Sequence, residues 1–248
     1  MEKSNRNWFQ RGGRSYASFR PEYPHALSTY LAEVTADRGT AVDVGCGNGQ
    51  LTIQLASHFS EVIGVDPSAD QIANVIPHER VRYIGAPAED IPLPDGYADL
   101  VTAAQAAHWF DLPRFYDEVR RIGREDAIVA LISYGVLQLG PAELCERFRH
   151  FYRNEIGPYW PPERKLVDTG YADIPFPFTE LPAPECRIER FWALGDFLGY
   201  VSTWSATQRV LEAGREDILA NFAADFSRLW GEGKQPVVWP INMRLGRV

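Results

Sequence analysis

Short apolar segments alternate with amphipathic ones between residues 40 and 135. The apolar segments are rich in Val, Ile and Ala and are bounded by turn residues, a pattern typical of buried parallel strands. They predict strands at 40–45, 61–66, 80–85, 98–104 and 126–133. Between them, residues 48–59 and 112–123 have apolar positions at helical spacing, with Asn48 as the expected cap of the first helix. This alternation predicts βαβ units and an α/β fold with a doubly wound sheet.

The pattern changes after residue 136. Residues 141–156 look helical, whereas the seven prolines within 157–184 argue against a regular element there. A strand near 185–193, helices over 195–230 and a last strand at 236–248 follow. Because strands return after a helical excursion, we expect one domain over 1–248. Its parts are a cofactor-binding core at 30–135, a cap that binds the acceptor at 136–184, and a completion of the sheet with helices at 185–248.

Composition narrows the class of protein. Of 248 residues, 45% are hydrophobic and 23% are charged, and the sequence contains no apolar segment of the roughly 20 residues that a membrane helix needs. The polar N-terminus does not resemble a secretory signal, and Cys46, Cys145 and Cys186 are too far apart in sequence for a disulfide framework, so we expect a cytoplasmic protein. The net charge of -8 argues against a nucleic-acid partner.

A glycine-rich turn, DVGCGNG at 43–49, follows the first predicted strand. Glycine lets the backbone approach a ligand closely and adopt positive φ without strain. A P-loop would need Lys and Ser or Thr after the last glycine, but Gln50 and Leu51 stand there. The dinucleotide motif GxGxxG would place its third glycine at position 50. The observed spacing is instead GxGxG, with Asp43 two residues before the first glycine.

Two carboxylates distinguish between the two remaining candidate cofactors, a dinucleotide and S-adenosylmethionine. Asp43 would lie poorly beside a pyrophosphate, whereas S-adenosylmethionine carries an ammonium that this acid could attract directly or through water. Asp66 ends the second predicted strand about 20 residues past the loop, where an acid can accept both ribose hydroxyls. Loop and acids together favour S-adenosylmethionine.

These segments resemble the class I S-adenosylmethionine-dependent methyltransferases, in the group called methyltransferase type 11. VDVGCGNG at 42–49, GVD at 64–66 and GAPAEDIPLPDGYADLV at 85–101 carry the resemblance. It implies a Rossmann-like, mostly parallel sheet of seven strands with a helical cap, and adenine contacts at Ala88 and Glu89. The expected cofactor-binding residues are Asp43, Gly45, Cys46, Gly47, Asn48, Gly49, Asp66, Pro67, Ala88, Glu89 and Gln105.

Two flanking segments, 9–24 and 201–209, are similar to a narrower set that includes trans-aconitate methyltransferase and related carboxyl methyltransferases. This likeness indicates a subgroup and no particular acceptor, because function depends on a site and not on a fold. The acceptor therefore stays open at this point: a carboxylate, which needs no base, or a hydroxyl or neutral amine, which can need one.

His108 is the candidate catalytic residue, as base or as orienting donor, because it follows the fourth strand at the edge where ligands bind in open α/β sheets. Gln105 is a candidate for the methionine part of the cofactor or for the acceptor. The candidate substrate-binding residues are Tyr16, Arg20, Trp109, Trp204 and Arg209. We expect no metal, because no His, Cys and carboxylate cluster has ligand spacing. We also expect a monomer or homodimer.

Three other functions compete with a small-molecule methyltransferase. A binding module that keeps the cofactor without turnover would carry the same motifs. A nicotinamide oxidoreductase is disfavoured by Gln50 and Asp43. An amino-directed nucleic-acid methyltransferase is weaker still, since Asp99 is followed by Leu100-Val101-Thr102 and not by a Pro-Pro-aromatic motif.

Overall fold

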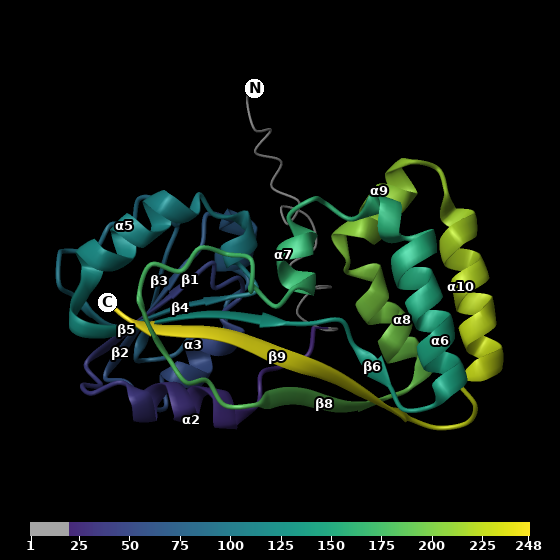
Figure 1. Cartoon of the computed structure of the whole chain (residues 1–248), viewed down its shortest axis with the longest axis horizontal. Helices are drawn as coiled ribbons and strands as arrows, with labels where there is room; N and C mark the ends of the chain where they lie inside the picture. The colour runs from purple at the N-terminus through teal and green to yellow at the C-terminus, as the bar shows by residue number, and fades with distance from the viewer. Residues whose placement is uncertain (1–19) are drawn as a thin grey trace.

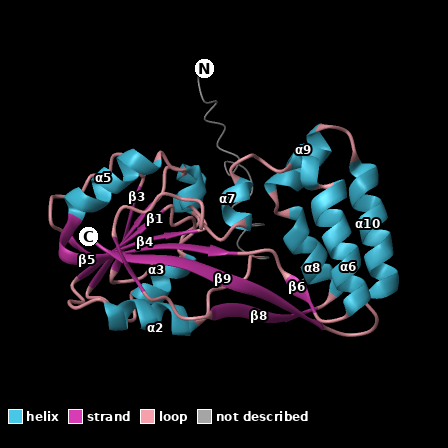
Figure 2. Cartoon of the chain, viewed as in Figure 1, coloured by secondary structure: helices cyan, strands magenta, loops and turns pink. Residues whose placement is uncertain are grey.

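The computed structural model describes residues 20–248 of the chain. Five parallel strands form the first half of its sheet. The strands run in the order β3-β2-β1-β4-β5, and each pairing among them is parallel, as Figures 1 and 2 show. All five strands expected between residues 40 and 135 are confirmed: β1 (Thr40–Val44), β2 (Glu61–Val65), β3 (Val81–Ile84), β4 (Ala98–Ala104) and β5 (Gly123–Tyr134).

Helices cover both faces of this half. The helices α2 (His25–Val34) and α3 (Gln50–Leu55) pack on one face, and α5 (Leu112–Ile122) packs on the other. Helix α5 buries Phe115, Tyr116, Val119 and Ile122, the spacing of a single helical stripe. The short helix α4 (Ala69–Ala73) follows β2. The prediction of Asn48 as a cap is wrong, because α3 begins at Gln50 and its N-cap is Gly49, which has no side chain to offer.

The second half of the sheet is antiparallel and is organised by β9 (Gln235–Arg247). This 13-residue strand pairs with β5 and also with β6 (Gln138–Leu139), β7 (Thr179–Leu181) and β8 (Cys186–Trp192). Over residues 20–248 the sheet therefore contains nine strands, two more than the seven expected. The expected strands near 185–193 and 236–248 are confirmed as β8 and β9.

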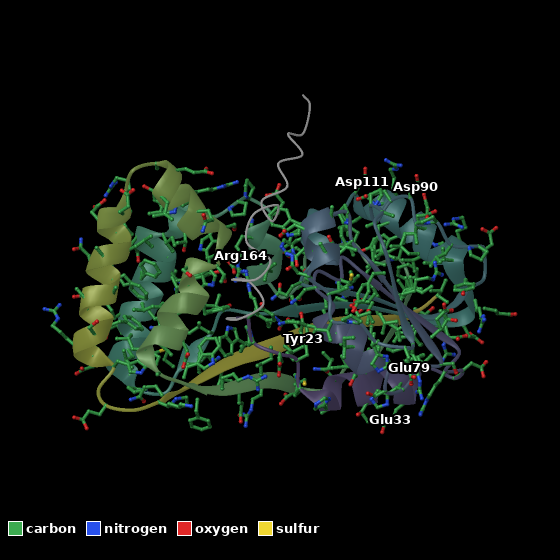
Figure 3. All side chains as sticks on the ribbon, turned by 180° about the vertical axis from the view of Figure 1, so that it is seen from behind. Tyr23, Glu33, Glu79, Asp90, Asp111 and Arg164 are labelled. Carbon is green, nitrogen blue, oxygen red and sulfur yellow. The ribbon has the colours of Figure 1, made fainter. Side chains whose placement is uncertain are left out.

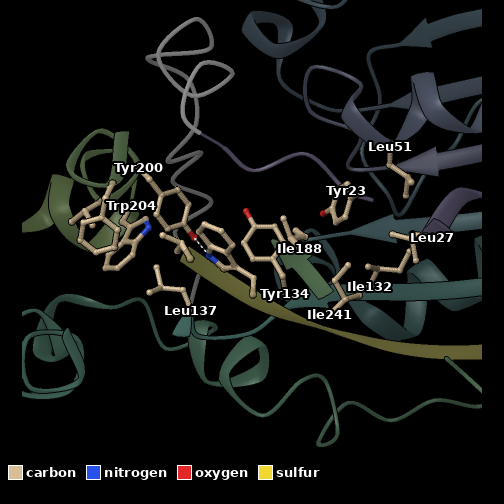
Figure 4. Packing of buried hydrophobic residues seen from close by; sticks show 14 of the residues in the cluster. Tyr23, Leu27, Leu51, Ile132, Tyr134, Leu137, Ile188, Tyr200, Trp204 and Ile241 are labelled. Carbon is tan, nitrogen blue, oxygen red and sulfur yellow. Dashed lines mark hydrogen bonds between the residues drawn. The ribbon is translucent and has the colours of Figure 1, made fainter. Parts of the chain in front are cut away.

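Four helices form a bundle beyond the end of the parallel strands: α6 (Ala142–His150), α8 (Leu194–Ser202), α9 (Ser205–Glu212) and α10 (Glu216–Leu229). Helix α6 continues into a π-helical turn, η2 (Phe151–Glu155). In the interior of the bundle the rings of Phe151 and Phe222 stack, with 3.7 Å between their centroids. Figure 4 shows the same buried cluster continuing from Trp204 and Tyr200 through Tyr134 to Leu27 under the sheet.

The segment 157–184 is more regular than expected. It contains the 3-10 turn η3 (Gly157–Tyr159), the helix α7 (Arg164–Asp168) and β7. Residues 163–174 contain no proline, and the carbonyls of Pro161 and Pro162 accept the first helical N–H groups at 2.9 and 3.2 Å. The prolines thus lie where they start α7 and not where they would break it. Helix α7 lies between the sheet half and the helical bundle (Figure 1).

Two negative findings hold for residues 20–248. No helix there is long and apolar enough to cross a membrane. No group of three or more His, Cys, Asp and Glu side chains in that range is arranged to hold a metal ion.

Candidate active site

The glycine-rich turn is fixed to the end of β2. The Gly45 N–H donates to the carbonyl of Val65 at 2.7 Å, and the Gly47 N–H donates to Oδ2 of Asp66 at 2.8 Å. The other Asp66 oxygen accepts the Ser68 N–H at 2.8 Å. Burial raises the pKa of this carboxyl, and the two backbone donors oppose that rise. The hydrogen bond between Gly47 and Asp66 thus joins two segments that are 19 residues apart in sequence, and it holds the Asp66 carboxylate against the turn.

The three glycines of the turn have different neighbours. A Cβ at Gly45 would lie 2.4 Å from Cβ of Ala106, and one at Gly49 would lie 2.2 Å from the Tyr83 hydroxyl. A Cβ at Gly47 would meet only Oε1 of Gln71, at 3.7 Å. Among the described residues a Cβ at Gly47 would thus meet no atom closer than an ordinary van der Waals contact, which leaves room for a ligand to approach.

Gln71 borders the same space and was not predicted from the sequence. It is 4% exposed, and its Oε1 is buried without a hydrogen-bond partner within the described part of the chain. A buried acceptor without a donor is costly, so it fits a ligand hydroxyl or amino group beside Gly47.

Asp43 lies beneath the turn and not on its surface. It is 1% exposed, and its two oxygens accept the hydroxyls of Thr52 at 2.7 Å and Thr102 at 2.8 Å. Desolvation raises the pKa of this carboxyl to about 6, although the two hydroxyl groups oppose the rise. Any attraction of Asp43 for an ammonium must therefore act through its charge or through an intervening water.

The remaining predicted cofactor residues are distributed around the turn. Cys46 and Asn48 belong to it, Pro67 follows Asp66 and is exposed, and Ala88 is buried. The Glu89 carboxylate accepts the Asp111 N–H at 2.7 Å, at the start of α5. This bond connects the predicted adenine segment to the segment after β4.

The segment after β4 contains Gln105 and His108. Gln105 has a positive φ of 54°, and its side-chain amide donates to the Tyr134 carbonyl at 3.0 Å. Backbone in this region is uncommon for a residue with a side chain and often marks a functional site. His108 lies in the short 3-10 turn η1 (Ala107–Trp109), with Nδ1 at 2.9 Å from the Tyr171 hydroxyl.

Two arginines from outside the parallel sheet lower the pKa of His108. Desolvation, then the charge of Arg164 on α7 and then that of Arg20, lower the pKa of the imidazole to about 3. Arg20 donates to the Tyr134 hydroxyl at 2.9 Å and its guanidinium lies 5.6 Å from the Tyr200 ring centroid. Figure 3 shows Arg164 between the sheet half and the helical bundle. His108 is consequently neutral at any physiological pH.

The structure brings together only some of the predicted acceptor residues. The Trp109 ring lies 4.8 Å from that of His108, and Arg20 is close enough to influence it. Trp204 is only 4% exposed and packs inside the helical bundle, where its ring lies 5.3 Å from that of Trp160. Arg209 donates to the Tyr159 carbonyl at 3.4 Å. Tyr16 lies outside the described residues.

Arg164 and Tyr171 were missed from the sequence. Both belong to the segment that its prolines had marked as irregular, and no motif links them to His108.

A twisted parallel sheet, a GxGxG turn after β1 and an acid at the end of β2 together define the class I S-adenosylmethionine-dependent methyltransferases. Residues 42–131 match a family described as a methyltransferase domain. A Dictyostelium discoideum protein, provisionally named a methyltransferase, is 38% identical over 210 residues, covering 83% of this chain and 80% of that protein. The chain belongs to this family, and its cofactor is S-adenosylmethionine.

Two further comparisons agree. A solved structure from Anaeromyxobacter dehalogenans, described as a type II methyltransferase, is 45% identical with a TM-score of 0.85, covering 92% of this chain and 98% of that one. A Saccharomyces cerevisiae protein named as an S-adenosylmethionine-dependent methyltransferase is 36% identical over 128 residues, covering 48% of this chain and 44% of that protein.

Proposed function

We propose that this methyltransferase modifies a small-molecule acceptor whose nucleophile arrives ready to react, without a proton being removed by His108. The observation that carries the proposal is the buried His108 imidazole, whose Nδ1 lies 2.9 Å from the Tyr171 hydroxyl and whose pKa is lowered by desolvation and by the charges of Arg164 and Arg20. A general base works best with a pKa near the operating pH, and a group with a pKa of about 3 is far too weak. Of the acceptors that the sequence leaves open, a carboxylate fits best.

The residues around the turn fit the cofactor. We assign the ribose hydroxyls to Asp66, the close backbone approach to Gly47, and a further polar contact to the buried Gln71 Oε1. Ala88 and Glu89 border the adenine, and Gln105 the methionine part. When bound, S-adenosylmethionine supplies an activated methyl group, so the protein contributes mainly alignment and exclusion of water.

His108 orients the acceptor in this proposal. The Nδ1 atom lies 2.9 Å from the Tyr171 hydroxyl, and the direction of this hydrogen bond depends on the imidazole tautomer. We assign the tautomer in which the hydroxyl donates to Nδ1 and the proton on Nε2 donates to an acceptor oxygen. Trp109 and the buried rings of the bundle exclude water from the same space.

The first test asks whether the methyl acceptor is a small molecule or a macromolecule. Purified protein is given S-adenosylmethionine together with either the low-molecular-weight filtrate or the macromolecular fraction of a cell lysate. We expect S-adenosylhomocysteine to form with the filtrate alone. Formation only with the macromolecular fraction would remove the small-molecule assignment, and binding of the cofactor without turnover in either fraction would favour the alternative of a non-catalytic binding module.

His108→Asn tests the role of the imidazole on the acceptor found in the filtrate. We expect kcat to fall by about tenfold or less, because the amide still donates a hydrogen bond. We also expect the pH profiles of wild type and variant to be parallel near pH 6.5, because His108 does not titrate there. A loss of 10²–10⁴-fold accompanied by disappearance of a rising limb near that pH would identify His108 as the base.

The three cysteines of the chain are free thiols. Free thiols support the proposal that the enzyme works in the reducing cytoplasm.

A further inference from the structure

We propose that Arg164 binds the carboxylate of the methyl acceptor, which makes the acceptor a small carboxylic acid and the product its methyl ester. The inference rests on the methyltransferase function and the carboxylate acceptor proposed above, and it adds the residue that would bind the carboxylate and determine specificity. Arg164 belongs to the five-residue helix α7 (Figures 1 and 3). This helix packs against the His108 turn η1.

The guanidinium of Arg164 is held firmly at one edge. Its Nε donates to the Tyr152 hydroxyl at 2.9 Å and to Oδ1 of Asp168 at 3.1 Å. Its carbon lies 4.7 Å from the Trp160 ring centroid and 5.8 Å from that of Tyr152. Because the side chain is only 18% exposed, these contacts fix both the position and the plane of the guanidinium.

The opposite edge of the same guanidinium is unused. Its two terminal nitrogens have no hydrogen-bond acceptor among residues 20–248. The Trp160 indole N–H, in the ring beneath, is also buried without a partner in the described part of the chain. Terminal guanidinium nitrogens form a planar fork that matches a carboxylate bidentately. A pre-oriented fork without a protein acceptor therefore points to an oxyanion ligand.

The local charge agrees with an anion. Arg164 and Arg20 both contribute positive charge here, since the charges of both lower the pKa of His108, and Asp168 contributes one negative charge beside Arg164. The chain as a whole carries -8. Positive charge beside the rings of Trp160, Tyr152 and Tyr200 fits an anion with a flat or apolar body.

The reaction needs no base with such an acceptor. A carboxylate oxygen forms a bond to the methyl carbon with one of its lone pairs, while the carbon–sulfur bond breaks and its electron pair stays on sulfur. The products are a neutral ester and the neutral sulfide S-adenosylhomocysteine, so no proton moves. Because the ester has lost the charge that Arg164 holds, we expect it to bind more weakly than the acid.

Binding and turnover are measured on the full chain with four probe acids, each beside its primary amide: benzoate, phenylacetate, hexanoate and succinate. Calorimetry in the presence of S-adenosylhomocysteine gives the affinities. Transfer of a tritiated methyl group, followed by alkali, identifies esters, because only an ester releases volatile methanol. We expect at least one acid to bind tenfold or more tightly than its amide, and the transferred label to be alkali-labile.

Arg164→Gln is compared with Arg164→Lys and with Lys165→Gln, which removes the same charge from an exposed neighbour on α7. We expect Arg164→Gln to raise the acid's Kd and KM by about 10–100-fold with S-adenosylhomocysteine affinity unchanged, Arg164→Lys to recover part of this loss, and Lys165→Gln to have no effect.

Three outcomes would overturn the inference: no acid binds wild-type protein better than its amide, the label transferred from the lysate filtrate is alkali-stable, or Arg164→Gln leaves acid binding unchanged. If Arg164→Gln does not fold, the acid-against-amide comparison on wild-type protein decides alone. Alkali-stable transfer would leave the proposed methyltransferase function intact, whereas absence of any transfer from the filtrate would count against that function itself.

Discussion

Asp43 is a carboxylate enclosed by the sheet and held by the hydroxyls of Thr52 and Thr102. Its pKa is raised from 3.8 to about 6, mainly by desolvation. Between about pH 4 and pH 6 the folded protein therefore binds more protons at this site than the unfolded chain does. The free energy of unfolding falls as the pH rises through that window, and a rise of roughly two pKa units corresponds to about 3 kcal/mol.

Replacing Asp43 by Asn should remove this pH dependence. We expect the stability of Asp43→Asn relative to wild type to improve by about 2–3 kcal/mol between pH 4 and pH 7, whatever the constant cost of the substitution. Urea unfolding at several pH values measures the difference. The surface variant Asp90→Asn serves as the control and should run parallel to wild type; a parallel curve for Asp43→Asn as well would show that Asp43 titrates normally.

Asp66 has a different role, because its oxygens accept the N–H groups of Gly47 and Ser68 and we propose that they also bind the ribose hydroxyls of the cofactor. Asp66→Ala removes a charged hydrogen-bond partner, a loss of about 1.5–3 kcal/mol, so S-adenosylhomocysteine should bind about 10–160-fold more weakly by calorimetry. Asp90→Ala, in an exposed position, should bind it normally. Equal affinities in both variants would separate Asp66 from the cofactor site.

At the scale of the element, the glycine-rich turn offers a matched pair of substitutions. Gly47 has φ of +57° and Gly96, in the turn before β4, has φ of +60°; a Cβ at Gly96 meets nothing within 4 Å. Alanine at either position costs about 1–2 kcal/mol of backbone strain, which is a few degrees of melting temperature. Only Gly47→Ala should also weaken S-adenosylhomocysteine binding, by tenfold or more, as calorimetry would show. Equal affinity in the two variants would mean that the ligand lies away from Gly47.

Elements with a local signal were predictable from the sequence. Strand β5 has eight consecutive buried residues, from Ala127 to Tyr134, and such a continuous apolar segment marks a central strand without any knowledge of its neighbours. The GxGxG turn and Asp66 were predictable for a similar reason, since the geometry of a βαβ unit fixes where strand ends meet.

Elements without a local signal were not predictable. Strands β6 and β7 have two and three residues, too few for any periodicity, and exist because β9 is long enough to pair with them. Helix α7 has only five residues, and its Arg164 contacts Tyr152 in the π-helical turn that continues α6. The proposed acceptor side of the site thus depends on tertiary contacts between segments that no motif connects.

At the scale of the whole molecule, the two halves share one core. The same cluster of buried residues includes Leu27 and Ile132 under the sheet and Phe222 and Phe226 in the bundle, with Tyr134 and Tyr200 between them (Figure 4). Because the apolar contacts are continuous, opening the bundle would expose the edge of the sheet core. We therefore expect the two halves to unfold as one cooperative unit.

Intrinsic fluorescence can test this cooperativity, because five of the seven tryptophans, Trp160, Trp192, Trp204, Trp230 and Trp239, pack in or beside the bundle, away from the cofactor turn. S-adenosylhomocysteine at 100 times its Kd stabilises the state that binds it by about 2.7 kcal/mol, or roughly 5–10 °C for a domain of this size. If the molecule is one unit, the fluorescence midpoint and the far-ultraviolet circular dichroism midpoint should coincide and rise together. Gly47→Ala, with its weaker binding, should show a smaller rise in both at the same ligand concentration. A fluorescence midpoint that stays fixed while the dichroism midpoint rises would mean that the bundle unfolds independently of the sheet that holds the cofactor.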